Sequence, residues 1–417
     1  MNVTVYPAKP KGILSAIPSK SMAHRLLICA ALTEGITRVR CTASSEDIDA
    51  TVRCLRAMGS NTQKIGNYYI VPKIKVHAGQ TVIFDCGESG TTLRLMMCIA
   101  AGLGLCARFT GSQRLFERPL SPLEEVLTDH GIVISRDGAG RIIQSGRAFG
   151  ENYEISGDVS SQFISGLLLM LPLCKGVSVT VTGTFESKPY VDLTVSALRQ
   201  ADLNVIEDGR KYTVTGRYDL RDCAVEGDWS NSAFPLVMGA LGGNVEVSGL
   251  NTDSLQGDKE ILSVLSRFGT KIEFINNRFF CKAENLTATR IDASDIPDMV
   301  PVLSVVAAVS EGATEIFGAK RLRLKESDRL QTVCDMINNL GGNCRVTDDG
   351  LIIEGVKKLS GGRVDACRDH RIAMSAAVAS IRCETPVAIE GAEAVNKSYP
   401  AFFEDLKSLG VNIEVEE

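Results

Sequence analysis

The chain has 417 residues, which is too long for one ordinary hydrophobic core, so two or three domains are expected. Its hydrophobic content of 44% and charged content of 23% are typical of globular proteins, and its net charge of −5 argues against a general binder of nucleic acids or membrane surfaces. No apolar run reaches the roughly 18 residues of a membrane span, and the N-terminus lacks a signal-peptide pattern, so we expect a cytoplasmic protein.

Cysteine and histidine usage gives no sign of a metal site. The 13 cysteines are odd in number, scattered, and never arranged as C-x-x-C. The four histidines, at positions 24, 77, 130 and 370, are also dispersed. We therefore predict reduced thiols in a cytoplasmic compartment and no metal ion.

One pattern recurs six times along the chain. Each copy begins with a polar or charged cluster, continues as an apolar stretch, and passes through a turn into a strand-like segment. The copies span 19–39, 87–109, 159–181, 228–247, 294–316 and 368–389. Their starts are about 70 residues apart, a period that indicates repeated structural units. The apolar stretches predict helices buried among sheets.

A second pattern recurs in step with the first and predicts an amphipathic helix, a turn and a strand. Its copies span 49–63, 120–135, 191–206, 258–274, 328–346 and 402–415. The predicted unit is strand–helix–strand–helix–strand–strand, with three units per domain. We predict one domain at 14–226 and a second made of 1–13 and 227–417, joined by a two-strand hinge. The N-terminal strand "NVTVYPA" is expected to complete the last unit.

Cations gather where the predicted helices begin. The segment "LRLKESDRL" (322–330) precedes a helix pattern, although a helix N-terminus disfavours cations by roughly 0.3–1 kcal/mol each. The same placement recurs at Lys20, Arg25, Arg94, Lys325, Arg329 and Arg371. Surface ion pairs contribute only about 0–1 kcal/mol, which is too little to explain the repetition. We infer bound anions, which Arg and Lys would hold as paired donors and point charges. If the buried helices run parallel, their N-termini share one anion-attracting surface.

Each of these residues also has a purely structural interpretation. Ser160 and Ser161 could be N-caps, and Gly90 could permit a tight turn. Arg114 and Arg118 could belong to a solvated loop cluster, and His370 could be a surface imidazole. There is no GxGxxG motif opening a βαβ unit and no GxxxxGK[ST] motif, so a nucleotide cofactor is not indicated.

The motifs taken together resemble a known family. "SKSMAHR", "GESGTTLR", "ERP", "SSQF", "SKPYVD", "LKESDRL", "DHRIAM" and "NKSYP" occur in the order found in the 5-enolpyruvylshikimate-3-phosphate synthases. The resemblance covers the whole chain and implies a two-domain inside-out α/β barrel of six βαβαββ units. It implies transfer of the enolpyruvyl group of phosphoenolpyruvate to the 5-hydroxyl of shikimate 3-phosphate by addition–elimination, with release of phosphate. No cofactor is implied, and we expect a monomer.

The resemblance also implies roles for individual residues. The shikimate 3-phosphate site is expected to comprise Lys20, Ser21, Arg25, Ser160, Ser161, Gln162, Ser187, Tyr190, Asp298 and Lys325. The phosphoenolpyruvate site is expected to comprise Lys20, Gly90, Thr91, Arg114, Gln162, Arg329, Arg371 and Lys397. Glu326 is the candidate acid/base at the methylene carbon, and Asp298 is the candidate base or orienter at the 5-hydroxyl. Lys20 would assist the leaving phosphate, and His370 completes the catalytic set.

Three positions depart from the family pattern. The loop "IPSKS" lacks a glycine between Pro18 and Ser19, so the loop that carries Lys20 is expected to differ in shape. Glu88 stands where many members have Asn, and its carboxylate would repel phosphoenolpyruvate unless a cation compensates. Arg321 stands where an Asn often contacts the substrate.

Three alternative functions differ in testable ways. A UDP-N-acetylglucosamine enolpyruvyl transferase would normally have a reactive Cys in the loop "GSQRLFERP", which has none. An RNA 3′-phosphate cyclase-like enzyme would need a nucleotide site and a larger basic surface. A non-catalytic anion-binding scaffold would not explain Glu326 and Asp298 among the cations.

Overall fold

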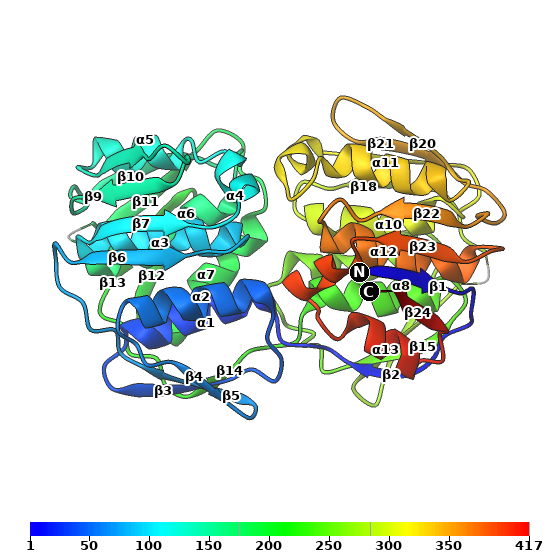
Figure 1. Cartoon of the computed structure of the whole chain (residues 1–417), viewed down its shortest axis with the longest axis horizontal. Coiled ribbons are helices and arrows are strands. Elements are labelled where there is room, and N and C mark those ends of the chain that lie inside the picture. Colours follow the sequence, from blue (N-terminus) through cyan, green and yellow to red (C-terminus); the bar gives the residue numbers. More distant parts are fainter. Residues whose placement is uncertain (175, 284, 417) are drawn as a thin grey trace. The chain divides into compact units, whose positions relative to one another are not determined.

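The computed structural model describes residues 1–174, 176–283 and 285–416. The chain forms two compact units, one made of Pro18–Val225 and the other of Met1–Ile17 with Glu226–Glu417 (Figure 1). The predicted boundary after residue 13 falls inside strand β2 (Lys11–Ser15). This strand pairs in parallel with β15 (Asn244–Ser248), so residues 14–17 stay with the second unit.

Within the described residues the strands form six four-stranded sheets that share one pattern. In one of them, β6 (Thr81–Asp85) and β7 (Cys106–Thr110) are parallel, and β9 (Ile142–Ser145) and β8 (Val133–Arg136) continue the sheet antiparallel. The same order relates β10 (Asn152–Ser156), β11 (Ser178–Thr182), β13 (Lys211–Thr215) and β12 (Asn204–Asp208). It also relates β18 (Arg290–Asp292), β19 (Ala313–Phe317), β21 (Leu351–Glu354) and β20 (Asn343–Val346).

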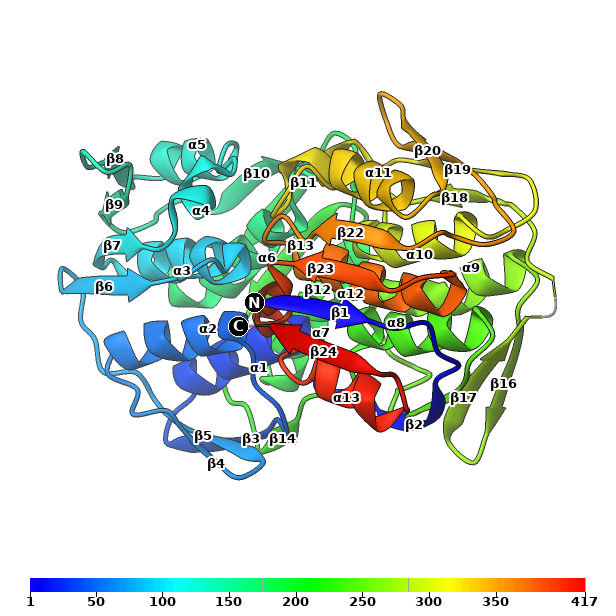
Figure 2. The ribbon, with the colours of Figure 1, turned by 45° about the vertical axis from the view of Figure 1, so that its right-hand side comes forward.

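The other three sheets show how distant segments complete a repeat. In one sheet β22 (Gly362–Asp365) and β23 (Val387–Glu390) are followed by β1 (Asn2–Val5) and β24 (Ile413–Glu416). Figure 2 shows β1 from the start of the chain between β23 and β24 from its end. As the sequence predicted, the N-terminal strand completes the last repeat.

Two repeats take their first strand from a distant part of the sequence, next to the points where the chain passes from one unit to the other. One sheet contains β14 (Cys223–Ala224), β3 (Ile36–Arg40), β5 (Tyr68–Pro72) and β4 (Gln63–Ile65). The other contains β2, β15, β17 (Arg278–Lys282) and β16 (Lys271–Ile275). Therefore β14 takes the first-strand position beside β3, while β2 takes that position beside β15.

The first helix of each repeat is buried almost all round, as its apolar composition predicts. These helices are α1 (Lys20–Leu32), α3 (Gly90–Leu103), α6 (Ser161–Met170), α8 (Trp229–Ala240), α10 (Val300–Ala307) and α12 (His370–Ala379). Small residues let them approach closely. A Cβ at Gly166 of α6 would lie 2.7 Å from Cys98 Sγ of α3, so the contact between these helices requires glycine.

The second helix of each repeat has a polar face. These helices are α2 (Glu46–Ala57), α5 (Leu123–Asp129), α7 (Lys188–Gln200), α9 (Ile261–Arg267), α11 (Arg329–Asn339) and α13 (Phe402–Ser408). Each unit has its own large apolar core. No helix in the described part of the chain is long and apolar enough to cross a membrane.

Candidate active site

In the unit that contains residues 226–417, the starts of three helices meet through polar side chains. Arg371, in the first turn of α12, donates from Nη2 to Ser230 Oγ in the first turn of α8, at 2.5 Å. Arg329, the first residue of α11, donates from Nε to Asp369 Oδ2 at 2.7 Å, and Asp369 is the N-cap of α12. These bonds bring the starts of two buried helices, α8 and α12, together with the start of the amphipathic helix α11.

Arg329 is buried, with 1% of its side chain exposed, and three carboxylates surround it. Besides its bonds to Asp369, Nη1 donates to Asp298 Oδ1 at 2.7 Å and Nη2 donates to Glu326 Oε2 at 2.8 Å. Burial opposes the guanidinium charge, but these carboxylates outweigh it and raise the pKa of Arg329 well above its usual value. Arg329 is therefore a permanent cation.

Asp298 lies among three cations. Its Oδ1 is 2.7 Å from Arg329 Nη1 and 3.6 Å from Lys325 Nζ, and its Oδ2 is 3.2 Å from Arg371 Nη2. Burial alone would raise the pKa of Asp298, but Arg371, Lys325 and Arg329 together hold it well below its usual value. Asp298 is thus ionised at neutral pH and accepts hydrogen bonds.

For Lys325, the effect of burial on the pKa outweighs that of the neighbouring charges. Burial lowers its pKa to about 8, and the attraction of Asp298 offsets this only in part. Its ammonium group can therefore lose its charge within one to two pH units of neutrality, which is unusual for lysine.

A further carboxylate, Asp258, lies close to this centre, although the sequence did not single it out. It is 3% exposed, and burial together with the negative charge of Asp298 raises its pKa to about 6. Arg371 and a hydrogen bond with Ser230 act in the opposite direction. We name the group Ser230, Asp258, Asp298, Lys325, Glu326, Arg329, Asp369 and Arg371 the carboxylate–arginine centre.

His370 and Lys397 are buried in the same unit. His370 is the first residue of α12, and its Nδ1 is 3.8 Å from Asp369 Oδ1. Its side chain is 2% exposed, so the interpretation as a surface imidazole is wrong. Lys397 is the last residue of a 3₁₀ helix, Ala392–Lys397, and is 5% exposed.

In the unit formed by Pro18–Val225, Lys20 is the first residue of α1. Ser19 caps this helix by accepting from Met22 N, and Lys20 Nζ is 2.9 Å from Asp47 Oδ2 of α2. The sequence pattern indicated Lys20, whereas Asp47 was not predicted as its partner. The cap and the ion pair together fix the loop that departs from the family pattern.

Arg25 is buried one turn further along α1 and bonds to three residues on two other helices, α6 and α7. Its Nε donates to Thr194 Oγ1 at 2.7 Å, and Nη2 donates to Ser165 Oγ at 3.2 Å and to Tyr190 O at 2.9 Å. Burial lowers its pKa to about 10, so it remains charged at neutral pH. Arg25 therefore joins α1 to α6 and α7.

Gln162 connects the starts of α3 and α6. It accepts from Arg94 Nη1 at 2.6 Å and donates to Thr91 Oγ1 at 2.8 Å. A Cβ at Gly90 would lie 2.7 Å from Arg118 Nη1 and 2.9 Å from Arg94 Nη1. Glycine at this position therefore allows two guanidinium groups to pack against the start of α3.

The serines predicted for the shikimate 3-phosphate site differ in their positions and contacts. Ser160 is the N-cap of α6 and accepts from Gln162 N, which confirms the capping interpretation for Ser160. Ser161 is the first residue of that helix and does not cap it. Ser187 precedes α7 with φ of 53°, a left-handed conformation that is uncommon outside glycine and often found at functional sites. Ser21 accepts from Arg25 Nη1 through its carbonyl, and Tyr190 lies in the first turn of α7.

Arg114 differs from the other predicted site residues. It lies on the short helix α4 (Gln113–Glu117), is 44% exposed, and pairs with Glu117 at 3.5 Å. Arg118 follows this helix and is only 9% exposed. The suggested solvated cluster thus describes Arg114 but not Arg118.

The cations at the helix starts also have carboxylate partners within the protein, and the inference that they bind anions stays a prediction. Ion pairs with Asp47 or Asp298 form at Lys20, Lys325, Arg329 and Arg371. These carboxylates come from distant segments, and no local sequence pattern links them to the cations. No group of three or more His, Cys, Asp or Glu side chains that could hold a metal occurs in the residues described.

The six four-stranded sheets of the described chain, with their buried helices, form the fold class that solved enolpyruvyl transferases share. In line with this, the chain shares its fold with the enolpyruvyl transferase NikO from Streptomyces tendae, with a TM-score of 0.78 at 16% identity and coverage of 99% of this chain and 98% of that one. The EPSP synthase from Acinetobacter baumannii has a TM-score of 0.81 at 27% identity, with both chains covered fully. These neighbours confirm the predicted inside-out α/β barrel architecture.

Sequence comparisons identify the family. Residues 6–406 match the family model described as EPSP synthase (3-phosphoshikimate 1-carboxyvinyltransferase). The chain is 42% identical to a 3-phosphoshikimate 1-carboxyvinyltransferase of Clostridium botulinum, covering 98% of this chain and 97% of the relative. It is also 42% identical to one of Clostridium kluyveri, covering 99% and 98%. The chain therefore belongs to the EPSP synthase family. It is a transferase of the shikimate pathway, and the alternative acceptors are not favoured.

Proposed function

We propose that the carboxylate–arginine centre, together with the polar residues around Lys20, Arg25 and Gln162 in the other unit, binds shikimate 3-phosphate and phosphoenolpyruvate and carries out enolpyruvyl transfer to the 5-hydroxyl. The observation that carries this proposal is the carboxylate–arginine centre, where Asp298 and Glu326 both lie within 3 Å of Arg329. Such a centre supplies proton acceptors and donors beside fixed cations, which addition–elimination through an anionic intermediate requires.

The binding roles follow from the charges in each unit. Arg329 and Arg371 would hold the carboxylate of phosphoenolpyruvate, because both are buried and carry planar paired donors. The phosphate of phosphoenolpyruvate would contact Lys20, Arg114, Gln162 and Lys397. Gly90 and Thr91 would lie beside this phosphate. The phosphate of shikimate 3-phosphate would contact Ser160, Ser161, Gln162 and Ser187. Its carboxylate would contact Ser21 and Arg25, and its ring would lie against Tyr190. Its other oxygens would contact Lys20, Asp298 and Lys325.

The proposed chemistry uses two carboxylates. Asp298 is ionised and would accept the proton of the 5-hydroxyl as that oxygen attacks C2 of phosphoenolpyruvate. Glu326 would deliver a proton to the methylene carbon and take one back as phosphate leaves. Glu326 is bound to Arg329 at 2.8 Å, and a substrate carboxylate on Arg329 would weaken this ion pair. Substrate binding would then favour the protonated form of Glu326, which the addition step needs. Lys20 would assist the departing phosphate, and His370 would support the site.

Replacement of Glu326 tests this assignment. In Glu326→Gln, which keeps the shape and a hydrogen-bond acceptor, we expect turnover to fall by roughly 100-fold or more, as for loss of a general acid/base. Binding of shikimate 3-phosphate, measured by calorimetry, should change little. Glu354→Gln is a matched control, because Glu354 is an exposed carboxylate bonded to Asn343. Near-normal turnover in Glu326→Gln with intact binding would refute the acid/base role.

The molecular setting of the enzyme is part of the proposal. We propose a monomer in the cytoplasm. All 13 cysteines are free thiols and most are buried, which suits a reducing compartment. Size-exclusion chromatography with light scattering should give a mass near 44.8 kDa, and twice that mass would contradict the monomer.

A further inference from the structure

The sheet β14-β3-β5-β4 has one face in the core and one face toward solvent. On β3, Thr37 and Val39 are buried, while Arg38 and Arg40 point outward. On β5 the inward residues Tyr69 and Val71 belong to the same apolar core as helix α1. The outward face is therefore on the opposite side of the sheet from the helix that carries Lys20 and Arg25.

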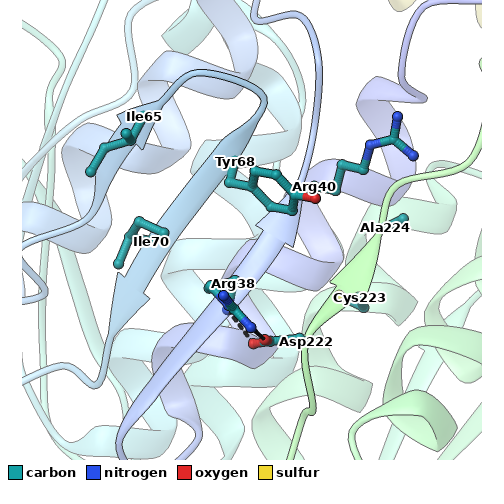
Figure 3. Close-up of a pocket in the computed structure, with 8 residues that line it drawn as sticks. All are labelled: Arg38, Arg40, Ile65, Tyr68, Ile70, Asp222, Cys223 and Ala224. Atoms are coloured by element: carbon teal, nitrogen blue, oxygen red, sulfur yellow. Dashed lines mark hydrogen bonds and ion pairs between the residues drawn. The ribbon is translucent and has the colours of Figure 1, made fainter.

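This outward face has a hollow of about 600 Å³, a volume typical of small-molecule sites. It is lined by Arg38, Arg40, Ile65, Tyr68, Ile70, Asp222, Cys223 and Ala224 (Figure 3). None of these residues belongs to the polar centres described above. The hollow is thus a separate feature that the transfer reaction does not use.

The strand register explains the composition of the hollow. Ile65 of β4 is paired with Tyr68 of β5, Tyr68 with Arg40 of β3, and Arg40 with Ala224 of β14. Paired residues in a sheet place their side chains side by side on the same face. The row therefore runs from an apolar side chain, 60% exposed, through an aromatic ring, 44% exposed, to a guanidinium group.

The two arginines of the hollow differ in whether a carboxylate is paired with them. Arg38 is neutralised by Asp222, to which its Nε donates at 2.7 Å and its backbone N at 2.8 Å. Figure 3 shows Arg40 extending away from that pair. Arg40 has no ion pair or side-chain hydrogen bond with any other residue in the described parts of the chain. One uncompensated cation thus lies beside an exposed aromatic ring.

We propose that this hollow is a binding site for a small aromatic anion. The ring of the ligand would pack on Tyr68, Ile65 and Ile70, and its carboxylate, sulfonate or phosphate would accept paired hydrogen bonds from Arg40. A purely inorganic anion would leave the apolar floor uncovered, and a neutral aromatic ligand would leave Arg40 without a partner. The apolar side chains and Arg40 together favour a ligand that has both an aromatic ring and an anionic group.

Two dyes that differ in one anionic group test the proposal. The probes are 8-anilinonaphthalene-1-sulfonate and N-phenyl-1-naphthylamine, which have the same rings with and without a sulfonate. Their fluorescence is titrated against the full-length enzyme in saturating shikimate 3-phosphate, which occupies the substrate site. Arg40→Gln should weaken sulfonate binding roughly tenfold and leave the neutral dye unaffected, since only the charged hydrogen bonds are lost. Tyr68→Thr should weaken both dyes.

A matched control is available in a sister sheet. Arg108 of β7 also faces solvent from a second strand and is paired with Ile83 and Ile143, but it has no tyrosine beside it. Arg108→Gln should leave both dyes unaffected. All three variants should retain normal turnover, which shows that they are folded. If Arg40→Gln and Arg108→Gln bind the sulfonate dye equally, or if Tyr68→Thr changes neither dye, the proposed site does not exist.

Discussion

At the scale of single residues, the charges of the carboxylate–arginine centre are set by contacts that the sequence does not reveal. Lys325 and Arg329 are four positions apart in the same segment, yet burial lowers the pKa of Lys325 to about 8, while carboxylates raise that of Arg329. The motif "LKESDRL" predicted which residues carry charge. It could not predict the pKa of each, because Asp298 lies before α10, about 30 residues earlier, and Asp369 belongs to the next repeat.

The lowered pKa of Lys325 predicts an alkaline loss of substrate affinity. Its folded pKa lies below the usual value of 10.5, so the ammonium is charged at pH 7 and mostly neutral at pH 9. The dissociation constant of shikimate 3-phosphate should therefore rise by roughly tenfold between these pH values. Lys325→Arg should remove this dependence, because arginine stays charged. Calorimetric titration across the pH range measures the effect.

The control for this prediction is Lys407→Arg, an exposed lysine in the last turn of α13. Its pH dependence should match that of the unmodified enzyme. An equally steep alkaline loss in Lys325→Arg would assign the titration to another group.

At the scale of elements, a buried chain of hydrogen bonds joins helices α1, α2 and α3. His24 Nδ1 of α1 is 2.7 Å from Thr51 Oγ1 of α2, which is 2.8 Å from Thr92 Oγ1 of α3. Thr92 donates to Ser89 Oγ, the N-cap of α3, at 2.9 Å. The sequence predicted the helices and their polar starts, but scattered histidines and threonines gave no reason to pair these three. This series of hydrogen bonds therefore results from the packing of the three helices.

Burial of neutral His24 predicts acid sensitivity of the fold. Burial lowers its pKa from 6.5 to about 3, so its stabilising contribution is complete above pH 6.5 and is lost as the pH falls toward 3. Between pH 7 and pH 5 this amounts to about 2 kcal/mol of unfolding free energy. His24→Asn keeps a hydrogen-bonding group without the titration, so its pH dependence should be smaller by that amount. Urea unfolding at the two pH values measures the difference.

His77→Asn is the control, because His77 is exposed and its Nδ1 contacts the carbonyl oxygen of the adjacent Ala78. It should keep the full pH dependence of the unmodified enzyme. If His24→Asn and His77→Asn lose the same free energy between pH 7 and pH 5, His24 is not the group responsible.

At the scale of the whole molecule, the sixfold repeat is the feature that the sequence predicts best. Apolar helices and amphipathic helices alternate in every copy, so spacing alone indicated the units, and the comparisons confirm the fold. Strand exchange was harder to foresee. The exact partners of β2 and β14 depend on where the chain crosses between units, and short strands such as Cys223–Ala224 carry no periodic pattern.

Phosphate release on mixing substrates tests the central claim most directly. With shikimate 3-phosphate and phosphoenolpyruvate together, the enzyme should release one phosphate for each enolpyruvyl group transferred. With either compound alone, release should stay at background, because both addition and elimination need the acceptor hydroxyl and the donor. Equal release from phosphoenolpyruvate alone, or none with both substrates, would contradict the proposed reaction.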